Sequence, residues 1–366
     1  MKVLNVVGAR PNFMKIAPLL REMRRHRELD PILVHTGQHY DEEMSDVFFS
    51  DLEIPAPDLH LGVGSASQAV QTAKIMIAFE QVLEKQKADL VVVVGDVNST
   101  LACSVVAAKA LVPVAHVEAG LRSFDRTMPE EINRVVTDAL STYLFTTSRD
   151  AEENLRQEGV SREKIHFVGN VMIDTLLRFA EKAEASTIRR RLGLEGDYGL
   201  LTLHRPSNVD EAEPLRRILK GLEAVARRIP ILFPIHPRTA RMLEEFGLST
   251  EIPGLKTVEP LGYLDFLHLE KHARLVLTDS GGIQEETTVL GVPCLTLRDN
   301  TERPVTLTEG TNVLVGNDTG RIVEEATKIL DGGAPRRRIP DLWDGKASER
   351  IVEILRRIAG EADYIG

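Results

Sequence analysis

The sequence predicts an α/β protein with two Rossmann-like, doubly wound domains that face a central cleft. Apolar segments of strand length alternate with amphipathic segments of helical length along the whole chain, which is typical of parallel βαβ units. The length of 366 residues is too great for one ordinary core, so it favours two domains, each with its own core. Two domains imply a cleft between them.

Twelve short apolar segments are expected to form the strands. In the first half they are Val3–Val7, Ile32–His35, Leu90–Val94, Val114–Val117, Tyr143–Thr146 and Ile165–Val168. Most have β-branched residues at consecutive positions, as in sheets that are covered on both faces. In the second half they are Leu200–Leu203, Ile231–Ile235, Thr257–Val258, Leu275–Thr278, Cys294–Leu297 and Val313–Val315.

The chain is expected to cross between the domains once and then to return. The stretch from Gly169 to Gly199 has two helix-like segments and is the expected crossover. A final helix is expected to start at Ser348 as N-cap, with an apolar stripe of Ile351, Ile354, Leu355 and Ile358. By fold analogy this helix returns to the first domain. We therefore expect one domain of residues 1–169 and 347–366 and another of residues 170–346.

The composition argues against several classes of protein. Hydrophobic residues at 43% and charged residues at 27% are the balance of a soluble globular enzyme. Because the chain has no apolar stretch of membrane-spanning length and no secretion signal, we expect a cytoplasmic protein without a membrane partner. The net charge of −10 argues against a nucleic-acid partner. The only cysteines, Cys103 and Cys294, provide neither a disulfide framework nor a cysteine metal site.

Four carboxylates lie where an expected strand has ended or an expected helix is about to begin. They are Asp96, Glu118, Glu130 and Glu131. Ligands of open α/β sheets bind outside the carboxyl ends of the strands, so acids at these positions are expected to face a site. Carboxylates there are suited to proton transfer on a bound ligand.

Two turns between a strand and a helix are candidate anion sites. The first, Gly8-Ala9-Arg10-Pro11, provides Arg10, with Lys15 nearby, but its single glycine gives little support for dinucleotide binding. The second, Asp279-Ser280-Gly281-Gly282, begins a helix whose N–H groups, with Ser280 as a capping hydroxyl, suit a diphosphate. Glu286, about a turn further on, is placed to accept hydrogen bonds from ribose. Alone, the first turn is also compatible with an ordinary surface loop, and the second is also compatible with an ordinary capped helix.

Several histidines are candidates for chemistry or for metal binding. His204 ends an expected strand and is a plausible proton donor or phosphate contact. His236 repeats this geometry one strand later, but we favour a hydrogen bond that anchors its loop. His268 and His272 are four residues apart, a spacing that can chelate a metal from a helix. No third ligand is evident from the sequence, so no metal site is expected.

Taken together, these residues resemble the non-hydrolysing UDP-N-acetylglucosamine 2-epimerase family over nearly the whole length. The resemblance is specific because several motifs occur together, although no single one would suffice. They are Gly8-Ala9-Arg10-Pro11, Thr36-Gly37-Gln38-His39, Gly95-Asp96, His116-Val117-Glu118-Ala119-Gly120-Leu121-Arg122, Pro129-Glu130-Glu131-Ile132-Asn133-Arg134, Asp279-Ser280-Gly281-Gly282-Ile283-Gln284-Glu285-Glu286 and Arg298-Asp299-Asn300-Thr301-Glu302-Arg303-Pro304.

The resemblance implies a glycosyltransferase-B type fold, with UDP held mainly by the C-terminal domain. It implies reversible exchange of UDP-N-acetylglucosamine and UDP-N-acetylmannosamine for cell-surface polysaccharide precursors, without a metal or a nicotinamide cofactor, by a homodimer. In the mechanism ascribed to the family, a base removes the C2 proton while UDP leaves C1. UDP then adds back to the bound 2-acetamidoglucal, and a proton is delivered to the opposite face of C2.

The resemblance also implies roles for individual residues. Asp96, Glu118 and Glu130 match the family's essential carboxylates, and His204 matches its essential histidine. Glu130 is preferred to Glu131 because the family's acid directly follows the proline. Leu261 and Phe266 fall where the family holds uracil. The matches to nucleotide and phosphate contacts are Arg10, Lys15, Ser280, Gly281, Gly282, Glu286 and Arg303.

One motif departs from the family. Well-studied bacterial members have a second, activating UDP-N-acetylglucosamine site that begins Gln-His-Arg, whereas this chain has Gln38-His39-Tyr40, so that site is not carried over. The variant also resembles relatives that act on UDP-diacetamido-glucuronic acid, which leaves the sugar's C3 and C6 substituents open. A hydrolysing epimerase, a glycosyltransferase and a nucleotide-sugar sensor would also be compatible with this scaffold. Carboxylates beside a diphosphate weaken binding unless they take part in chemistry, which argues against the sensor.

Overall fold

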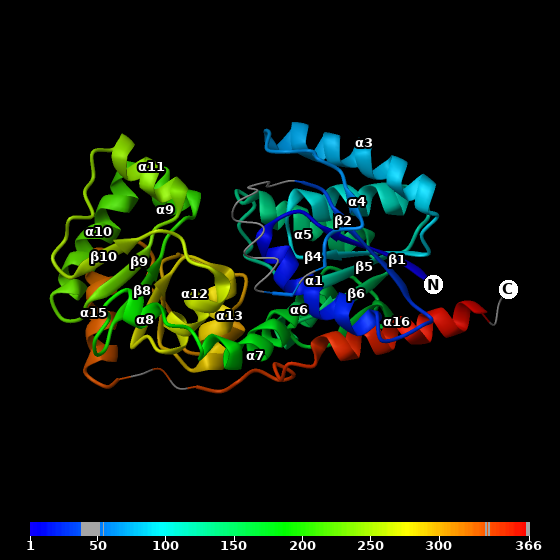
Figure 1. The fold of residues 1–366 in the computed structure, drawn as a ribbon. Helices are drawn as coiled ribbons and strands as arrows, with labels where there is room; N and C mark the ends of the chain where they lie inside the picture. The colour runs from blue at the N-terminus through cyan, green and yellow to red at the C-terminus, as the bar shows by residue number, and fades with distance from the viewer. Residues whose placement is uncertain (38–51, 54, 334, 336, 364–366) are drawn as a thin grey trace. The chain divides into compact units, whose positions relative to one another are not determined.

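The computed structural model describes residues 1–37, 52–53, 55–333, 335 and 337–363, apart from the side chains of Arg10 and residues 361–363. The motif Gln38-His39-Tyr40 therefore lies outside the described residues. The chain forms two compact units (Figure 1). Unit 1 comprises Met1–Leu177 and Asp341–Gly366, and unit 2 comprises Arg178–Pro340. Each unit contains one parallel sheet with helices, which confirms the predicted α/β fold class.

Unit 1 has a seven-stranded sheet in the order β3-β2-β1-β4-β5-β6-β7. The strands are β1 (Lys2–Val7), β2 (Asp30–His35), β3 (Leu59–His60), β4 (Leu90–Val94), β5 (Val114–Ala119), β6 (Tyr143–Thr146) and β7 (Ile165–Phe167). Strand β3 was not expected from the sequence, because two residues are too few for a periodic signal. All the strands pair in parallel.

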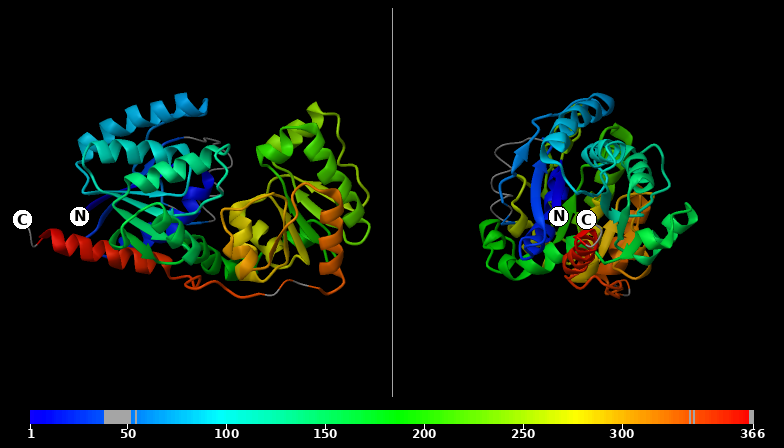
Figure 2. Two further views of the ribbon diagram at one scale, coloured as in Figure 1. Left: turned by 180° about the vertical axis from the view of Figure 1, so that it is seen from behind. Right: turned by 90° about the vertical axis from the view of Figure 1, so that its right-hand side faces the viewer.

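Helices cover both faces of this sheet (Figure 2). They are α1 (Arg10–Met23), α3 (Gln68–Gln86), α4 (Asn98–Lys109), α5 (Pro129–Leu140), α6 (Arg149–Gln157), the first part of α7 (Val171–Ala183), α16 (Ala347–Asp363) and the 3₁₀ turn η1 (Arg162–Lys164). Phe79 of α3 and Cys103 of α4 pack with Val91 of β4 in one buried cluster. Helices α1 and α16 contact each other.

Helix α16 begins at Ala347, so the prediction that Ser348 is its N-cap is wrong. The carboxylate of Asp174 in α7 instead accepts hydrogen bonds from the backbone N–H groups of Ala347 at 3.0 Å and Ser348 at 2.7 Å. An acceptor from a distant helix thus replaces the expected local cap. Among the described side chains of α16, the fully buried apolar ones are Ala347, Ile351, Val352 and Leu355, with Ala359 almost so, while Ile354 and Ile358 are partly exposed.

The unit boundaries differ by a few residues from the expected domain boundaries of 169/170 and 346/347. They lie at 177/178 and 340/341. The first turns of α7 belong to unit 1, where the Thr175 hydroxyl donates to the backbone carbonyl of Met14 at 2.6 Å. On the return path, the indole N–H of Trp343 donates to the carbonyl of Thr147 at 2.9 Å. A boundary inferred from the pattern of helices and strands does not register contacts of this kind.

Unit 2 repeats the architecture with a six-stranded parallel sheet in the order β10-β9-β8-β11-β12-β13. The strands are β8 (Gly199–Thr202), β9 (Ile231–Pro234), β10 (Leu255–Val258), β11 (Leu275–Thr278), β12 (Cys294–Thr296) and β13 (Asn312–Leu314). The helices are α8 (Ile188–Arg191), α9 (Pro206–Val209), α10 (Ala212–Ala226), α11 (Pro237–Glu245), α12 (Tyr263–Lys271), α13 (Gly281–Leu290), α14 (Val305–Thr308) and α15 (Thr319–Leu330).

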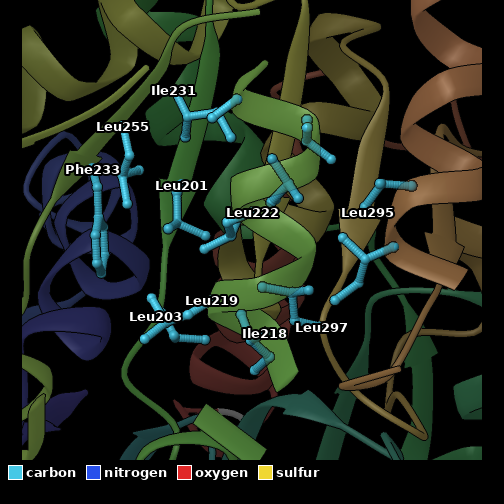
Figure 3. Packing of buried hydrophobic residues seen from close by; sticks show 14 of the residues in the cluster. Leu201, Leu203, Ile218, Leu219, Leu222, Ile231, Phe233, Leu255, Leu295 and Leu297 are labelled. Atoms are coloured by element: carbon cyan, nitrogen blue, oxygen red, sulfur yellow. The ribbon is translucent and has the colours of Figure 1, made fainter. Parts of the chain in front are cut away.

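Two buried clusters form the core of unit 2. In the larger one, Leu222 of α10 packs against Leu201 of β8 and Leu295 of β12 (Figure 3). The other cluster includes Leu269 of α12 and Val276 of β11. None of the helices in the described part of the chain is long and apolar enough to span a membrane.

In both sheets the strand order reverses between two neighbouring strands. These pairs are β1 and β4 in unit 1, and β8 and β11 in unit 2. Ligands of doubly wound sheets bind outside the carboxyl ends of such strands. Each unit therefore has one position at which the fold favours a site.

Candidate functional site

The turn after β1 is fixed to the end of β4 by Asn12, a residue that the sequence patterns did not single out. Its side-chain carbonyl accepts from the N–H groups of Gly8 at 3.2 Å and Ala9 at 3.0 Å. Its side-chain amide donates to the carbonyl of Val94 at 3.0 Å. Gly8 is required for close packing, because a Cβ there would lie 2.0 Å from Oγ of Ser99.

A buried ion pair joins Lys15 of α1 to Glu118 of β5. Glu118 has a φ of +74°, and the register between β5 and β6 shifts at this point. A bulge of this kind redirects a side chain away from the regular strand alternation. Both side chains are less than a tenth exposed, and a Cβ at Gly95 would lie 3.0 Å from Nζ of Lys15. The structure therefore brings Lys15 and Glu118 together at the end of β4, where Gly95 lies.

Asp96 follows β4 and forms an ion pair with the guanidinium of Arg134 in α5. The Asp96 side chain is 22% exposed, whereas that of Arg134 is 2% exposed. Arg134 also lies 3.3 Å from the carboxylate of Glu131. One buried arginine thus holds the Asp96 carboxylate, which keeps part of its surface accessible to a ligand.

The adjacent acids Glu130 and Glu131 lie in different environments. Glu131 is buried and accepts hydrogen bonds from the N–H and hydroxyl of Ser123, at 2.8 and 2.9 Å, and from the N–H of Phe124 at 3.0 Å. Glu130 is partly exposed in the first turn of α5, and its side chain has no hydrogen-bond or ion-pair partner within the described part of the chain. Glu131 therefore anchors a loop, while Glu130 is available to a ligand.

A buried network that was not expected from the sequence supports the turn before Asp96. His116 of β5 donates from Nε2 to the carbonyl of Gly95 at 2.8 Å, and its Nδ1 lies 2.6 Å from Asp138. Asp138 also pairs with Arg122 at 2.7 Å. Burial alone would raise the pKa of Asp138, but His116 and Arg122 hold that pKa below its usual value. Asp138 thus remains a carboxylate that fixes His116.

Asp279, directly after β11, joins the carboxyl ends of the two central strands of unit 2. Its buried carboxylate accepts from the N–H groups of His204 at 3.0 Å and Arg205 at 2.8 Å and lies 3.0 Å from Nδ1 of His204. Burial opposes ionisation, but His204 and these backbone donors lower the pKa of Asp279. The His204 side chain is 40% exposed. Nδ1 of His236 accepts from the N–H of Arg238 at 3.1 Å, which confirms a loop-anchoring hydrogen bond.

The start of α13 lies against the guanidinium of Arg303. A Cβ at Gly281 would lie 2.5 Å from Nη1 of Arg303, so only glycine permits this approach. Arg303 is held by Glu302 and, at 2.8 Å, by Glu285. Helix N–H groups beside a guanidinium suit an anion.

The prediction that the Ser280 hydroxyl caps α13 is wrong. Ser280 occupies the N-cap position, but its side chain makes no capping hydrogen bond. The turn is held instead through the Ser280 backbone. Its N–H donates to the Thr278 hydroxyl at 3.0 Å, and its carbonyl accepts from Gln284 at 3.2 Å.

Glu286 lies inside α13, next to a second buried carboxyl group. It accepts from the Tyr263 hydroxyl at 3.1 Å. Burial raises the pKa of Glu286. Burial also raises the pKa of the neighbouring Glu270, and the negative charge on Glu286 raises the pKa of Glu270 further. Leu261 and Phe266 are partly buried against the cluster that contains Leu269, so their side chains contribute to packing.

The structure thus gathers the selected residues into one group in each unit. The unit 1 group contains Lys15, Asp96 and Glu118, with Glu130 one turn before Arg134. The side chain of Arg10 lies outside the described residues. The unit 2 group contains His204, Ser280, Gly281 with adjacent Gly282, Arg303 and the more deeply buried Glu286.

Comparisons with known proteins match nearly the whole chain. A family model described as UDP-N-acetylglucosamine 2-epimerase matches residues 21–356. Over 364 residues, the chain is 45% identical to the UDP-N-acetylglucosamine 2-epimerase of Methanocaldococcus jannaschii, covering 97% of this chain and 99% of that protein. Over 364 residues it is 42% identical to the UDP-2,3-diacetamido-2,3-dideoxy-D-glucuronate 2-epimerase of Pseudomonas aeruginosa, covering 98% and 100%.

A solved structure shows the same fold. The crystal structure of the Methanocaldococcus jannaschii UDP-GlcNAc 2-epimerase in complex with UDP-GlcNAc and UDP matches with a TM-score of 0.91 at 45% identity. The match covers 98% of this chain and 100% of that chain.

Proposed function

Because the chain belongs to the UDP-N-acetylglucosamine 2-epimerase family, we propose that it interconverts UDP-N-acetylglucosamine and UDP-N-acetylmannosamine. The observation that carries this proposal is the group of acids at the carboxyl edge of the unit 1 sheet. Asp96 and Glu118 each end a strand beside a cation, and Glu130 begins the adjoining helix. Carboxylates held in this way are suited to the two proton transfers that inversion at C2 requires.

The proposed reaction proceeds by elimination and re-addition. A carboxylate removes the C2 proton, the C2–H electron pair forms a double bond to C1, and the C1–O bond breaks as UDP leaves. UDP then attacks C1 of the 2-acetamidoglucal, and a second acid delivers a proton to the opposite face of C2. We assign these transfers to Asp96, Glu118 and Glu130. The carboxylate of Asp279 lies 3.0 Å from Nδ1 of His204, and we propose that His204 uses its other nitrogen to assist the departing diphosphate.

Unit 2 residues are proposed to hold the nucleotide. The Ser280 hydroxyl, the N–H groups of Gly281 and Gly282 and the guanidinium of Arg303 would bind the diphosphate, because they combine a helix N-terminus with a fixed cation. Glu286 would accept from ribose hydroxyls. The remaining proposed contacts are Leu261 and Phe266 for uracil, and Arg10 and Lys15 for phosphate.

A second candidate substrate is UDP-2,3-diacetamido-2,3-dideoxy-D-glucuronate. The observation that favours it is the 42% identity to the Pseudomonas aeruginosa enzyme named for that sugar. The two candidates have the same chemistry at C2 and differ at C3 and C6. Parallel turnover assays with both UDP-sugars would distinguish them.

Incubation in heavy water tests the reaction itself. We expect deuterium at C2 of the recovered UDP-sugar, with no acceptor present, because the proton removed exchanges with solvent. No exchange with either sugar would eliminate the epimerase proposal. UDP and free sugar accumulating in equal amounts would favour a hydrolysing epimerase. Asp96→Asn should abolish most of the exchange, while Glu324→Gln, at an exposed carboxylate of α15, should leave it unchanged.

The family resemblance also supports two broader proposals. We propose that the protein is a homodimer and that it acts in the cytoplasm on precursors of cell-surface polysaccharides. Sedimentation equilibrium would measure the oligomeric state, and a mass of one chain would contradict the dimer. Cell fractionation would test the location.

A further inference from the structure

We propose that unit 2 contains a binding site for a divalent transition metal of the zinc class, formed by Glu184, His268 and His272. The spacing of the two histidines indicated a possible chelating pair, but the sequence showed no third ligand. The structure provides one, because one ligand atom from each of these side chains lies within 4.8 Å of the others. Two imidazoles and a carboxylate are a common set of protein ligands for Zn²⁺, which completes its tetrahedron with water.

The three side chains come from two separate segments of the fold. His268 lies in the last turns of α12, and His272 is its C-cap, so the two rings are one turn apart with centroids separated by 4.6 Å. Glu184 directly follows the end of α7. Its carboxylate lies 3.1 Å from Nε2 of His272. A bound metal would therefore link the segment after α7 to the end of α12.

His268 already has the orientation of a metal ligand. Its Nδ1 lies 2.9 Å from the carbonyl oxygen of Ala183. Because a carbonyl only accepts, Nδ1 carries the hydrogen, and Nε2 of the neutral ring presents its lone pair. Metal-binding histidines are commonly held by such a hydrogen bond from the other ring nitrogen.

The charged groups around the site include both a ligand and a competitor. The Glu184 carboxylate pairs with both Lys271 and His272. The ammonium of Lys271 contacts the same carboxylate and opposes a divalent ion by its charge. Lys271 contacts Oε1 of Glu184, whereas Oε2 faces His272. Removal of the ammonium charge should therefore strengthen binding of a divalent ion.

Titration of the full chain with ZnCl₂, in the absence of any UDP-sugar, tests the proposal. Calorimetry should give one equivalent of bound Zn²⁺, and Co²⁺ in its place should give the visible absorption of a tetrahedral site. His272→Gln and Glu184→Gln should each weaken Zn²⁺ binding by at least about 10-fold. Loss of a residue that only supports a metal ligand already has an effect of this size. Lys271→Met should strengthen it.

A matched control comes from elsewhere in the chain. His26 lies 3.1 Å from Glu22, one helical turn away, but no second histidine accompanies it in the described clusters. His26→Gln should therefore leave Zn²⁺ binding unchanged. The proposal is overturned if the parent chain shows no saturable binding, or if His272→Gln binds Zn²⁺ as tightly as the His26→Gln control does. Because the readout is metal binding, the result does not depend on the epimerase proposal.

Discussion

Two neighbouring acids, Glu130 and Glu131, show how position separates structural from chemical roles at the scale of single residues. Glu131→Gln should destabilise the protein by about 2–4 kcal/mol, because it weakens charge-assisted hydrogen bonds to Ser123 and Phe124 and leaves Arg134 poorly compensated. Glu130→Gln should leave stability within about 0.5 kcal/mol, because its side chain is partly exposed. The Glu130→Gln substitution should instead lower turnover by about 10²–10⁴-fold, because Glu130 is proposed to transfer a proton.

Urea unfolding and turnover assays on both variants provide the measurements. Unchanged turnover in Glu130→Gln would remove Glu130 from the mechanism. An unfolding midpoint equal to that of the parent in Glu131→Gln would contradict its anchoring role.

A glycine provides a second test at residue scale. In Gly281→Ala the new methyl group would meet Nη1 of Arg303 at 2.5 Å and Oε1 of Glu302 at 2.9 Å. Since a hydrogen bond to a charged group is worth about 1.5–3 kcal/mol, displacing Arg303 should weaken UDP binding by roughly tenfold or more. Calorimetric titration with UDP measures the change.

The control for this substitution is Gly360→Ala in α16. The added methyl group meets nothing within 4 Å, and alanine favours a helix by up to about 1 kcal/mol over glycine. UDP affinity should be unchanged in this variant. Equal affinities in Gly281→Ala and the parent would contradict the proposed diphosphate position.

Part of the candidate site could be predicted from the sequence, and physical reasons explain the rest. Asp96 and Asp279 were expected at strand ends because the preceding apolar segments fix where those strands stop. That Asp279 holds His204, 75 positions away, depends on the pairing of β8 with β11. The sequence likewise did not identify Glu184 as a candidate metal ligand, because only the tertiary fold brings it to α12. Local patterns contain no signal for such contacts.

At the scale of elements, an acidic pair connects α12 to α13 and should make stability depend on pH. Burial raises the pKa of Glu286 to about 7. Burial and the charge of Glu286 together raise the pKa of Glu270 well above its usual value. In the unfolded chain both groups return to ordinary values near 4.5. The folded state therefore retains protons that the unfolded state releases. The resulting stabilisation is complete below about pH 4.5 and is lost as the pH rises through about 7.

Glu270→Gln tests this linkage, because the amide has nearly the same shape as the carboxyl group and cannot ionise. The free energy of unfolding of the parent should fall as the pH rises from about 4.5 to about 7, by up to about 1.4 kcal/mol per pH unit for each proton involved. The fall should be smaller in Glu270→Gln. Urea midpoints at several pH values provide the comparison, and equal slopes would contradict the coupling of these helices through a shared proton.

The elements themselves were largely predictable, because alternating apolar segments determine where parallel strands lie. The exceptions were short or depended on distant partners. Strand β3 has two residues and is defined only by its pairing with β2. The start of α16 is set by Asp174, which is 173 positions from Ala347.

At the scale of the whole molecule, the chain leaves unit 1, forms unit 2 and returns. Residues 341–366 complete unit 1, although unit 2 separates them from the rest of it. The only tryptophan of the chain, Trp343, lies in this returning segment, is 2% exposed and donates to Thr147. Its fluorescence should therefore report the unfolding of unit 1. Cys294, fully buried in β12, provides a chemical probe of unit 2.

Loss of the Asp174 carboxylate should separate the unfolding midpoint that Trp343 fluorescence reports from the one that Cys294 labelling reports. Asp174→Ala removes the acceptor for the first N–H groups of α16, at a cost of about 1–3 kcal/mol. Because each unit has its own core, the urea midpoint from Trp343 fluorescence should fall. The urea concentration at which a thiol reagent labels Cys294, identified by peptide mapping, should stay the same. If both midpoints fell equally, the two units would unfold as one cooperative body, and their independence would be disproved.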